Sequence, residues 1–399
     1  MKIFICFLIG FMMQLSGLYG QSKKLLEGWK YHCIDSTRTP LLPERNSGAW
    51  CFGIDSGDIN GDGYTDIASG KWAYINPGKE TESVWQRIVF PIIADALFVY
   101  DFDRDGKAEI YAFNCNHQYQ LKLNASLNTF DTLWVSALPI CNHGISTQGY
   151  SKSDITGDGV PELLINNQDN NLYAMQFNKA ANKFITYCIA KGQTTDKGLA
   201  IGDLDGDGDN DIVTAYKPDN SSEFNGVCWF ENPGRITGKW IKHAVTQVKW
   251  KVDRVAIAHI DPDRQPEIII TEGRKPPGKD NDASVYILKS PGNPKDSAWV
   301  QKVLVNQYST NSLTAIDFDQ DGDMDLITAE HKGISPKLQV WLNDSFGNFT
   351  LHIIDEGKEN HIGAFPVDID NDGDYDIVGW GWYNWKDMHL WENQIIKDK

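Results

Sequence analysis

The sequence lacks the features that define several common classes of protein. It has no run of basic residues, no heptad repeat and no low-complexity segment, and its 37 Lys and Arg are outnumbered by 54 Asp and Glu, which gives a net charge of −17. Nucleic acid is therefore not an expected partner. The G-x-S-x-G phrase of serine hydrolases is absent, which excludes a nucleophilic serine of that type. Beyond the first 20 residues, no apolar stretch is long enough to predict a membrane span.

The N-terminus has the pattern of a secretory signal peptide. Lys2 gives a positive start, residues 3–13 are apolar, and Gly20 precedes the expected cleavage site. We therefore expect residues 1–20 to be removed, and residues 21–399 to form a secreted or periplasmic protein. Six of the seven cysteines remain in that mature chain. Cys115 and Cys141 are the best candidates for a disulfide, because both would lie near the same face of neighbouring repeats.

What the chain does contain is one nine-residue phrase repeated seven times. It reads acid-x-acid-x-Asp-Gly-x-x-acid, and successive copies begin 43 to 58 residues apart. A period of this size indicates an array of similar supersecondary units. We number the copies loop 1 to loop 7, and they begin at Asp58, Asp101, Asp154, Asp203, His259, Asp317 and Asp368.

Each loop offers the oxygen ligands that a hard cation requires. In loop 1, Asp58, Asn60, Asp62 and Asp66 supply side-chain oxygens, and Gly63 permits the sharp turn between them. A flexible cage made wholly of protein oxygens suits calcium better than magnesium. The sequence therefore predicts structural Ca²⁺ in loops that keep this pattern.

Six of the seven loops keep the pattern well enough to predict calcium. Loop 5 does not, because His259 replaces the first acid and Arg264 replaces the glycine, so we expect it to bind no metal. The predicted ligands outside loop 1 are Asp101, Asp103, Asp105, Glu109, Asp154, Thr156, Asp158, Glu162, Asp203, Asp205, Asp207, Asp211, Asp317, Asp319, Asp321, Asp325, Asp368, Asp370, Asp372 and Asp376.

The segments around the loops predict strands. An EF-hand array would need Glu at position 12 and two flanking helices. In this chain no copy has Glu at position 12, and short apolar runs such as 162–165 and 267–270 follow the loops, as is typical of buried strands. A short run of small residues precedes each loop, and two further strands follow, so each repeat contains four strands.

Seven four-stranded units arranged radially predict an all-β fold, a seven-bladed β-propeller with calcium-binding loops. The seventh repeat lacks a fourth strand. Residues 29–35 have the aromatic-x-x-His spacing of the other fourth strands. We therefore expect the N-terminal strand to close the ring and remove a sheet edge, so that residues 21–399 form one domain.

The Asp-x-Asp-x-Asp-Gly phrases resemble those of the FG-GAP/VCBS family of calcium-binding propeller repeats. The resemblance covers nearly all of the mature chain. It implies a propeller with calcium in its loops. It does not imply one activity, because the family includes adhesins, binding modules and carbohydrate-active enzymes.

The face opposite the acidic loops is the candidate functional site. There the chain leaves each second strand and enters the next first strand, through connections that carry His, Tyr, Arg, Lys, Glu and Trp, as a sugar-binding surface would. The predicted catalytic residues are His117, His143, Tyr216 and Arg254. The predicted substrate-binding residues are Lys71, Trp72, Asn114, Asn167, Lys217, Glu272, Glu330, His331, His361 and Trp382. The phrases around Cys115–His117 and Cys141–His143 also permit a small Zn²⁺ site.

We favour an enzyme that cleaves a uronate-containing polysaccharide by β-elimination. That reaction needs a cation for the carboxylate, a base for the C5 proton and an acid for the leaving oxygen. His117 or His143 would be the base. Tyr216 would be the acid and Arg254 the carboxylate clamp, a set that resembles that of propeller-fold polysaccharide lyases of the ulvan lyase type.

Two other functions fit the same surface. The main alternative is a non-catalytic glycan-binding or adhesion module. The third is a hydrolase with Glu272 and Glu330 as its carboxylate pair. In all three cases the expected partner is an acidic polysaccharide or another glycan, and we expect a monomer.

Overall fold

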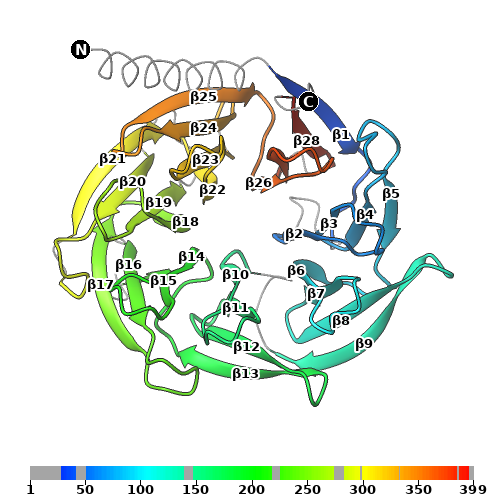
Figure 1. The fold of residues 1–399 in the computed structure, drawn as a ribbon, viewed down its shortest axis with the longest axis horizontal. Coiled ribbons are helices and arrows are strands. Elements are labelled where there is room, and N and C mark those ends of the chain that lie inside the picture. Colours follow the sequence, from blue (N-terminus) through cyan, green and yellow to red (C-terminus); the bar gives the residue numbers. More distant parts are fainter. Residues whose placement is uncertain are drawn as a thin grey trace, which may run out of the picture.

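The computed structural model describes residues 28–41, 51–138, 147–217, 225–273, 283–296, 299–331, 333–383 and 386–394. Within this part of the chain, 28 strands form seven four-stranded sheets, and neighbouring strands are antiparallel throughout. The sheets are arranged in a ring around a central axis (Figure 1). The fold is thus a seven-bladed β-propeller, as the repeats predict.

We number the blades in chain order and describe each from its innermost to its outermost strand. Blades 1 to 3 are β2 (Ile54–Gly57), β3 (Asp66–Ser69), β4 (Trp72–Ile75) and β5 (Gln86–Val89); β6 (Asp95–Tyr100), β7 (Glu109–Phe113), β8 (His117–Asn124) and β9 (Thr129–Ala137); and β10 (Tyr150–Ser153), β11 (Glu162–Asn166), β12 (Leu172–Asn178) and β13 (Lys183–Ala190).

Blades 4 to 7 follow the same order. They are β14 (Leu199–Gly202), β15 (Asp211–Tyr216), β16 (Asn225–Glu231) and β17 (Ile241–Val248); β18 (Lys251–Ala258), β19 (Glu267–Gly273), β20 (Ala283–Lys289) and β21 (Val300–Gln307); β22 (Thr310–Ile316), β23 (Asp325–Glu330), β24 (Lys337–Asn343) and β25 (Phe349–Glu356); and β26 (Ile362–Val367), β27 (Asp376–Trp380), β28 (Met388–Asn393) and β1 (Trp29–Asp35).

The hydrophobic core lies between neighbouring blades, because the second strand of each blade is covered on both faces. β3, β7, β11, β23 and β27 are buried at every position, which explains the apolar residues that follow the first, acidic residue of each strand. One inter-blade cluster joins Tyr111 of blade 2 to Leu163 and Phe184 of blade 3. The outermost strands are mostly exposed or half-buried, as strands with one face in solvent are.

The N-terminal strand closes the ring as predicted. β1 pairs with β28 from Trp29↔Asn393 to Asp35↔Met388, so the last blade is completed by the start of the chain. The His32 Nε2 atom lies 2.7 Å from Glu392 Oε2, which also accepts a hydrogen bond of 2.5 Å from Thr81 of blade 1. This contact ties the first blade to the last.

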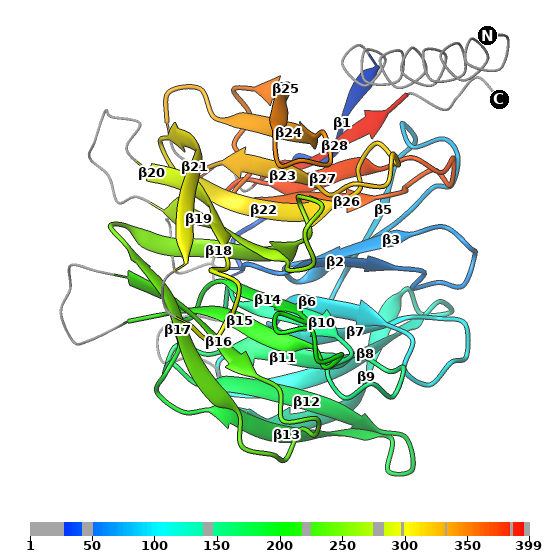
Figure 2. The ribbon, with the colours of Figure 1, turned by 60° about the vertical axis from the view of Figure 1, so that its left-hand side comes forward.

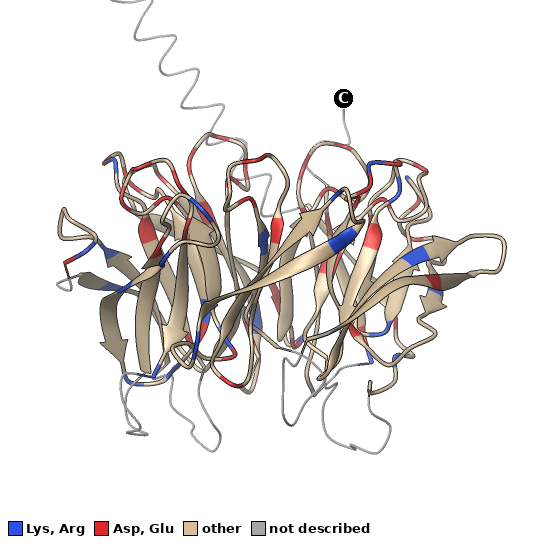
Figure 3. Ribbon diagram, turned by 90° about the horizontal axis from the view of Figure 1, so that it is seen from below, with Lys and Arg blue, Asp and Glu red and all other residues tan. Residues whose placement is uncertain are grey.

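The two faces of the ring differ in charge. The acidic loops join the first and second strands of the blades, and Figure 3 shows Asp and Glu gathered along the upper loops of the ring. The side view in Figure 2 shows that the blades stand side by side around the axis. No helix in the described residues is both long and apolar enough to cross a membrane.

Candidate functional site

The acidic loops are curled around their first carboxylate. In loop 1, Asp58 Oδ1 accepts hydrogen bonds from the backbone N–H groups of Gly61 (2.7 Å) and Asp62 (3.1 Å), and Oδ2 accepts one from Gly63 (2.8 Å). Gly63 has a φ of 90°, a conformation that favours glycine. The same bond, from the position-6 glycine to the position-1 aspartate, recurs at 2.8 to 3.1 Å in loops 2, 3, 4, 6 and 7. Hydrogen bonds within each loop therefore give it its shape.

Four loops have a buried aspartate at position 9. These residues are Asp66, Asp211, Asp325 and Asp376. Each accepts a backbone N–H bond from position 2 of its own loop and another from an Asn at or directly after the end of the third strand, at 2.7 to 3.0 Å. Burial is the main cause that raises the pKa, to about 7 for Asp66 and Asp211 and to about 8 for Asp325 and Asp376. A cation would keep these carboxylates ionised.

In loops 2 and 5 a lysine ammonium lies among the carboxylates. Lys122, on the third strand of blade 2, places Nζ 3.0 Å from Asp103, 2.6 Å from Asp105 and 2.8 Å from Glu109. Lys289 occupies the same register in blade 5, opposite Glu267, and forms ion pairs with all three acids of loop 5. In these two blades a lysine of the third strand therefore neutralises part of the negative charge of the loop.

Several loops bring enough oxygens together to hold a metal ion. Candidate ligand atoms within 4.8 Å of one another come from Asp101, Asp103, Asp105 and Glu109, from Asp203, Asp205 and Asp211, from Asp261, Asp263 and Glu267, and from Asp317, Asp319 and Asp325. All are carboxylates, which suits a hard cation. In loop 3 the Thr156 hydroxyl donates to Glu162 Oε1 at 3.1 Å, so both predicted ligands are within reach of one site.

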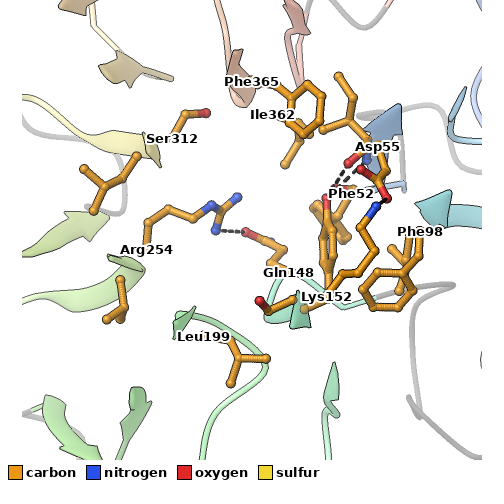
Figure 4. Close-up of a pocket in the computed structure, with 17 residues that line it drawn as sticks. Phe52, Asp55, Phe98, Gln148, Lys152, Leu199, Arg254, Ser312, Ile362 and Phe365 are labelled. Carbon is orange, nitrogen blue, oxygen red and sulfur yellow. Dashed lines mark hydrogen bonds and ion pairs between the residues drawn. The ribbon is translucent and has the colours of Figure 1, made fainter. Parts of the chain in front are cut away.

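Two adjoining cavities open along the ring axis, and Phe52 and Gln148 line both. The first, of about 320 Å³, is enclosed by the innermost strands and includes Asp55, Lys152 and Arg254 (Figure 4). The second, of about 270 Å³, lies on the face opposite the acidic loops. It is lined by Phe52, Gln148, Lys197, Lys251, Asp253, Gly273, Asn311, His331, His361, Trp382 and Tyr383. We call it the mouth cavity.

Cationic side chains from blades 4 and 5 converge around these cavities. Gln148 Oε1 accepts hydrogen bonds from Lys197 Nζ (2.6 Å) and from Arg254 Nη1 (3.2 Å). Lys197 also forms an ion pair with the buried Asp253, and Lys251 Nζ lies 3.2 Å from Asp196. Burial lowers the pKa of Lys197 to about 8, and the nearby cations Lys251 and Arg254 add to this, whereas Asp253 opposes it. Lys197 is therefore partly neutral in mildly alkaline solution.

Aromatic rings and histidines from blades 6 and 7, together with Phe52 before blade 1, form the other side of the mouth cavity. The rings of Phe52 and Trp382 are stacked, with centroids 5.2 Å apart and an interplanar angle of 9°. His331 stacks on Tyr383 at 5.3 Å, and the rings of His331 and His361 meet nearly perpendicularly at 4.0 Å. The mouth cavity thus has a cationic side and an aromatic side.

The structure brings some of the predicted site residues together. His331, His361 and Trp382 line the mouth cavity, and Arg254 lines the adjoining one. The predicted catalytic residue His143 lies outside the described residues. The remaining predicted residues line neither cavity.

Four of those remaining residues secure backbone turns instead. Glu272 accepts bonds of 2.9 Å from the N–H groups of Trp250 and Ser284. Asn114, Asn167 and Glu330 likewise accept backbone N–H groups of nearby turns. A polar side chain at this position is thus explained by the need to satisfy buried backbone donors. Glu272 and Glu330, the carboxylate pair of the hydrolase hypothesis, both have this role.

The other five lie in several environments away from the cavities. Trp72 is buried between blades beneath the Arg38 guanidinium, and Lys71 donates to the carbonyl of Pro40. Tyr216 packs with apolar residues of blades 3 and 4, where the Lys242 ammonium lies 3.8 Å from its ring centroid. The predicted base His117 and the predicted substrate-binding residue Lys217 are exposed. The predicted proton donor and one predicted base are therefore not at the cavity.

The Zn²⁺ site that the sequence permits around Cys115 is not supported. Cys115 is disulfide-bonded, so its sulfur does not serve as a thiolate ligand. Cys141, the partner that we predict for it, lies outside the described residues. Cys33, Cys51, Cys188 and Cys228 are free.

Lys197, Asp253, Gln148 and Glu359 were not predicted from the sequence. Lys197 stands two residues before the innermost strand β14, in a segment otherwise rich in small residues. Asp253 lies inside β18, at a register shift opposite β19. A charged residue just before the run of small residues that forms the innermost strand is the signal that could have identified both.

Comparison with known proteins agrees with this architecture. The chain contains FG-GAP-like repeats, which a family model matches at residues 154–214 and 317–379. No curated protein sequence matches the chain. Among solved structures, BBS1N in complex with ARL6DN has a TM-score of 0.56 at 10% identity, covering 93% of this chain and 98% of that one. The exotype rhamnogalacturonan lyase YesX has a TM-score of 0.50 at 13% identity, covering 91% and 76%. At these identities the similarity concerns the fold.

Proposed function

We propose that this propeller binds a uronate-containing polysaccharide at the mouth cavity and cleaves it by β-elimination. The observation that carries the proposal is the convergence of Lys197, Lys251 and Arg254 around adjoining cavities, with Lys197 buried and its pKa lowered to about 8. The side chains of Lys251 and Arg254 can neutralise a carboxylate, and a lysine of low pKa can act as a base near neutral pH.

The reaction balances with these residues. Neutral Lys197 takes the C5 proton, which the neutralised C6 carboxylate makes more acidic. The electron pair of the C5–H bond then forms the C4–C5 double bond and expels the O4 oxygen. That oxygen takes a proton, which the protonated Lys197 can return. Arg254 and Lys251 stabilise the negative charge that develops on the carboxylate.

The opposite side of the mouth cavity suits a sugar ring. Trp382 and Phe52 present a stacked aromatic pair, and Asn311 adds an amide that contacts Asp253. Sugar faces stack on aromatic rings while polar groups bind hydroxyls. The substrate chain would thus lie across the mouth, with its carboxylate toward blades 4 and 5.

The proposed location and cofactor fit this reaction. Residues 1–20 would direct export, and calcium in the acidic loops would stabilise the ring rather than take part in the reaction. The rhamnogalacturonan lyase mentioned above shares only the fold, so the assignment rests on the cavity. A non-catalytic glycan-binding module would use the same surface and is the alternative outcome of the test.

The test is to incubate the mature protein with a panel of uronate-containing polysaccharides in calcium and to follow ultraviolet absorbance of the unsaturated product. We expect turnover on at least one polymer, with a loss of at least 100-fold in Lys197→Ala and Arg254→Ala. Lys183→Ala, on the exposed strand β13, is the matched control and keeps wild-type turnover. Binding without product across the panel would overturn the lyase and leave a binding module.

A further inference from the structure

A cluster beside the mouth cavity has the composition of a transition-metal site. His331, Glu359 and His361 are all buried, and one possible ligand atom from each lies within 4.8 Å of the other two. The cluster lies on the face opposite the acidic loops and shares no residue with them. We propose that these three residues bind one divalent cation of the zinc class.

The backbone fixes all three positions. His331 directly follows β23, and its N–H donates to the Ser309 carbonyl at 3.1 Å. Glu359 and His361 flank Asn360 just before β26, and the His361 carbonyl accepts a 3.0 Å bond from the Ser312 hydroxyl. The ligands therefore come from the junction of blades 6 and 7, where both strand ends are anchored.

Glu359 breaks the pattern of the repeat. In blades 5 and 6 the glutamate at the end of the second strand caps the turn, as Glu272 and Glu330 do. In blade 7 that position is Gly381, and Glu359 reaches across from the preceding connection to accept the N–H groups of Trp382 (3.1 Å) and Tyr383 (2.9 Å). A Cβ on Gly381 would lie 2.9 Å from Glu359 Oε2. The glycine thus makes room for a carboxylate next to the histidines.

The geometry suits imidazole and carboxylate ligation. Glu359 Oε1 contacts His331 Nδ1, and the His331 and His361 rings meet at an interplanar angle of 84°. Zinc bonds of about 2.0–2.1 Å place tetrahedral ligand atoms about 3.3 Å apart, so small side-chain rotations would bring the cluster to that spacing. Two imidazoles favour a zinc-class ion over calcium, which prefers oxygen ligands alone.

The site would be open toward the mouth cavity. His331 and His361 line that cavity together with Lys197 and Lys251. Three protein ligands leave a fourth position for water or for an oxygen of a bound molecule, and one carboxylate leaves a divalent site with a net charge of +1. An anionic oxygen ligand is therefore favoured. That this ligand belongs to an acidic sugar rests on the proposed function, whereas the metal site does not.

The test measures the metal without substrate. The mature protein is stripped with chelator, returned to excess calcium to occupy the acidic loops, and titrated with Zn²⁺ by calorimetry. Co²⁺ absorption reports the ligand field. We expect one Zn²⁺ per chain with micromolar or tighter affinity, and an intense visible Co²⁺ spectrum. Binding weakens at least 30-fold in His361→Gln and Glu359→Gln.

His259→Gln is the matched control, because His259 is exposed and lies in loop 5, on the opposite face from the cluster; it keeps wild-type binding. The proposal is overturned if the folded wild-type protein binds no Zn²⁺ in excess calcium, or if His259→Gln and His361→Gln lose binding equally. The wild-type measurement decides the matter even if a cluster variant fails to fold. One bound Zn²⁺ without elimination activity would sink the lyase proposal alone, and elimination without Zn²⁺ binding would sink the metal site alone.

Discussion

The Lys122 ammonium lies 2.6 Å from the Asp105 carboxylate, inside loop 2, where a calcium ion would otherwise bring the positive charge. The Lys289 ammonium likewise forms ion pairs with the carboxylates of loop 5. Loops 1, 4, 6 and 7 instead have Ile75, Glu231, Leu342 and Glu392 in the same register, opposite the position-9 aspartate. Loop 4 receives a cation from the neighbouring blade 5, because Lys295 Nζ lies 3.0 Å from Asp205. The blades thus differ in whether the protein itself supplies a cation to the acidic loop, and from where.

Loop 2 is therefore predicted to bind calcium more weakly than loops 1, 6 and 7. Calcium must displace Lys122 or compete with its charge. Lys122→Gln should add one tighter calcium site in a calorimetric titration of the chelator-stripped protein. Lys183→Gln on the exposed outer strand β13 is the control and should leave the titration unchanged. An identical site count and affinity in wild type and Lys122→Gln would contradict the prediction.

Calcium removal should lower the melting temperature, and the loss should grow with pH. The buried Asp325 and Asp376 have pKa values of about 8 in the ion-free fold, against about 3.9 in an unfolded chain. Between these values the folded state binds more protons, so the stability of the chelated protein falls as pH rises through about 4 to 8. Melting curves in chelator at pH 5.5 and pH 8 measure this. An unchanged melting temperature in excess chelator at pH 8 would rule out structural calcium.

Most of the fold could be predicted because it depends on local, repeated signals. The turn glycines and acids of the loops fix where each first strand ends and each second strand begins, and apolar runs such as that of β11 mark buried strands. Ring closure was also predictable, because the residues of β1 repeat the spacing of other outer strands. These signals need no knowledge of long-range contacts.

The candidate site was harder to predict, because polar residues at the strand ends serve two purposes. Glu272 and Glu330 look like ligands in the sequence, yet they satisfy backbone donors of their turns. Apart from charged residues beside the innermost strands, the sequence carries no sign of which polar side chain points inward. Lys197 and Glu359 reach the mouth cavity or its edge through the packing of different blades, which spacing within one repeat does not encode.

The turn role of Glu272 makes a separate prediction. Glu272→Ala should lower the free energy of unfolding by about 1–3 kcal/mol, since it removes the acceptor of the buried Ser284 N–H and of the partly buried Trp250 N–H. Glycan affinity at the mouth cavity should change by less than threefold. Chemical unfolding and a binding titration on the same samples measure both. A large loss of glycan affinity at unchanged stability would return Glu272 to the substrate site.

The lowered pKa of Lys197 predicts the pH dependence of the proposed reaction. A base must be neutral, so kcat/KM should rise with pH and level off above about 8, the value that burial gives the ammonium. Arginine keeps the positive charge but stays protonated at these pH values, so it cannot act as the base. Lys197→Arg should therefore lose activity across the whole pH range. A profile in wild type that falls as pH rises from 6 to 8 would exclude Lys197 as the base.

Ring closure by β1 predicts what removal of that strand does. Without residues 1–36, β28 becomes an open sheet edge. Glu392 also loses its contact with His32 and keeps only Thr81 of the two side chains that join blades 1 and 7 at this point. An exposed edge pairs readily with other chains. We expect the truncated protein to self-associate in size-exclusion chromatography and to melt at least 10 °C lower than the mature chain, in calcium.

The mature chain with His32→Ala is the matched control, since it keeps the strand and loses only the ion pair, and it should stay monomeric. If the truncated protein is monomeric and melts with the mature chain, the N-terminal strand is dispensable to the ring.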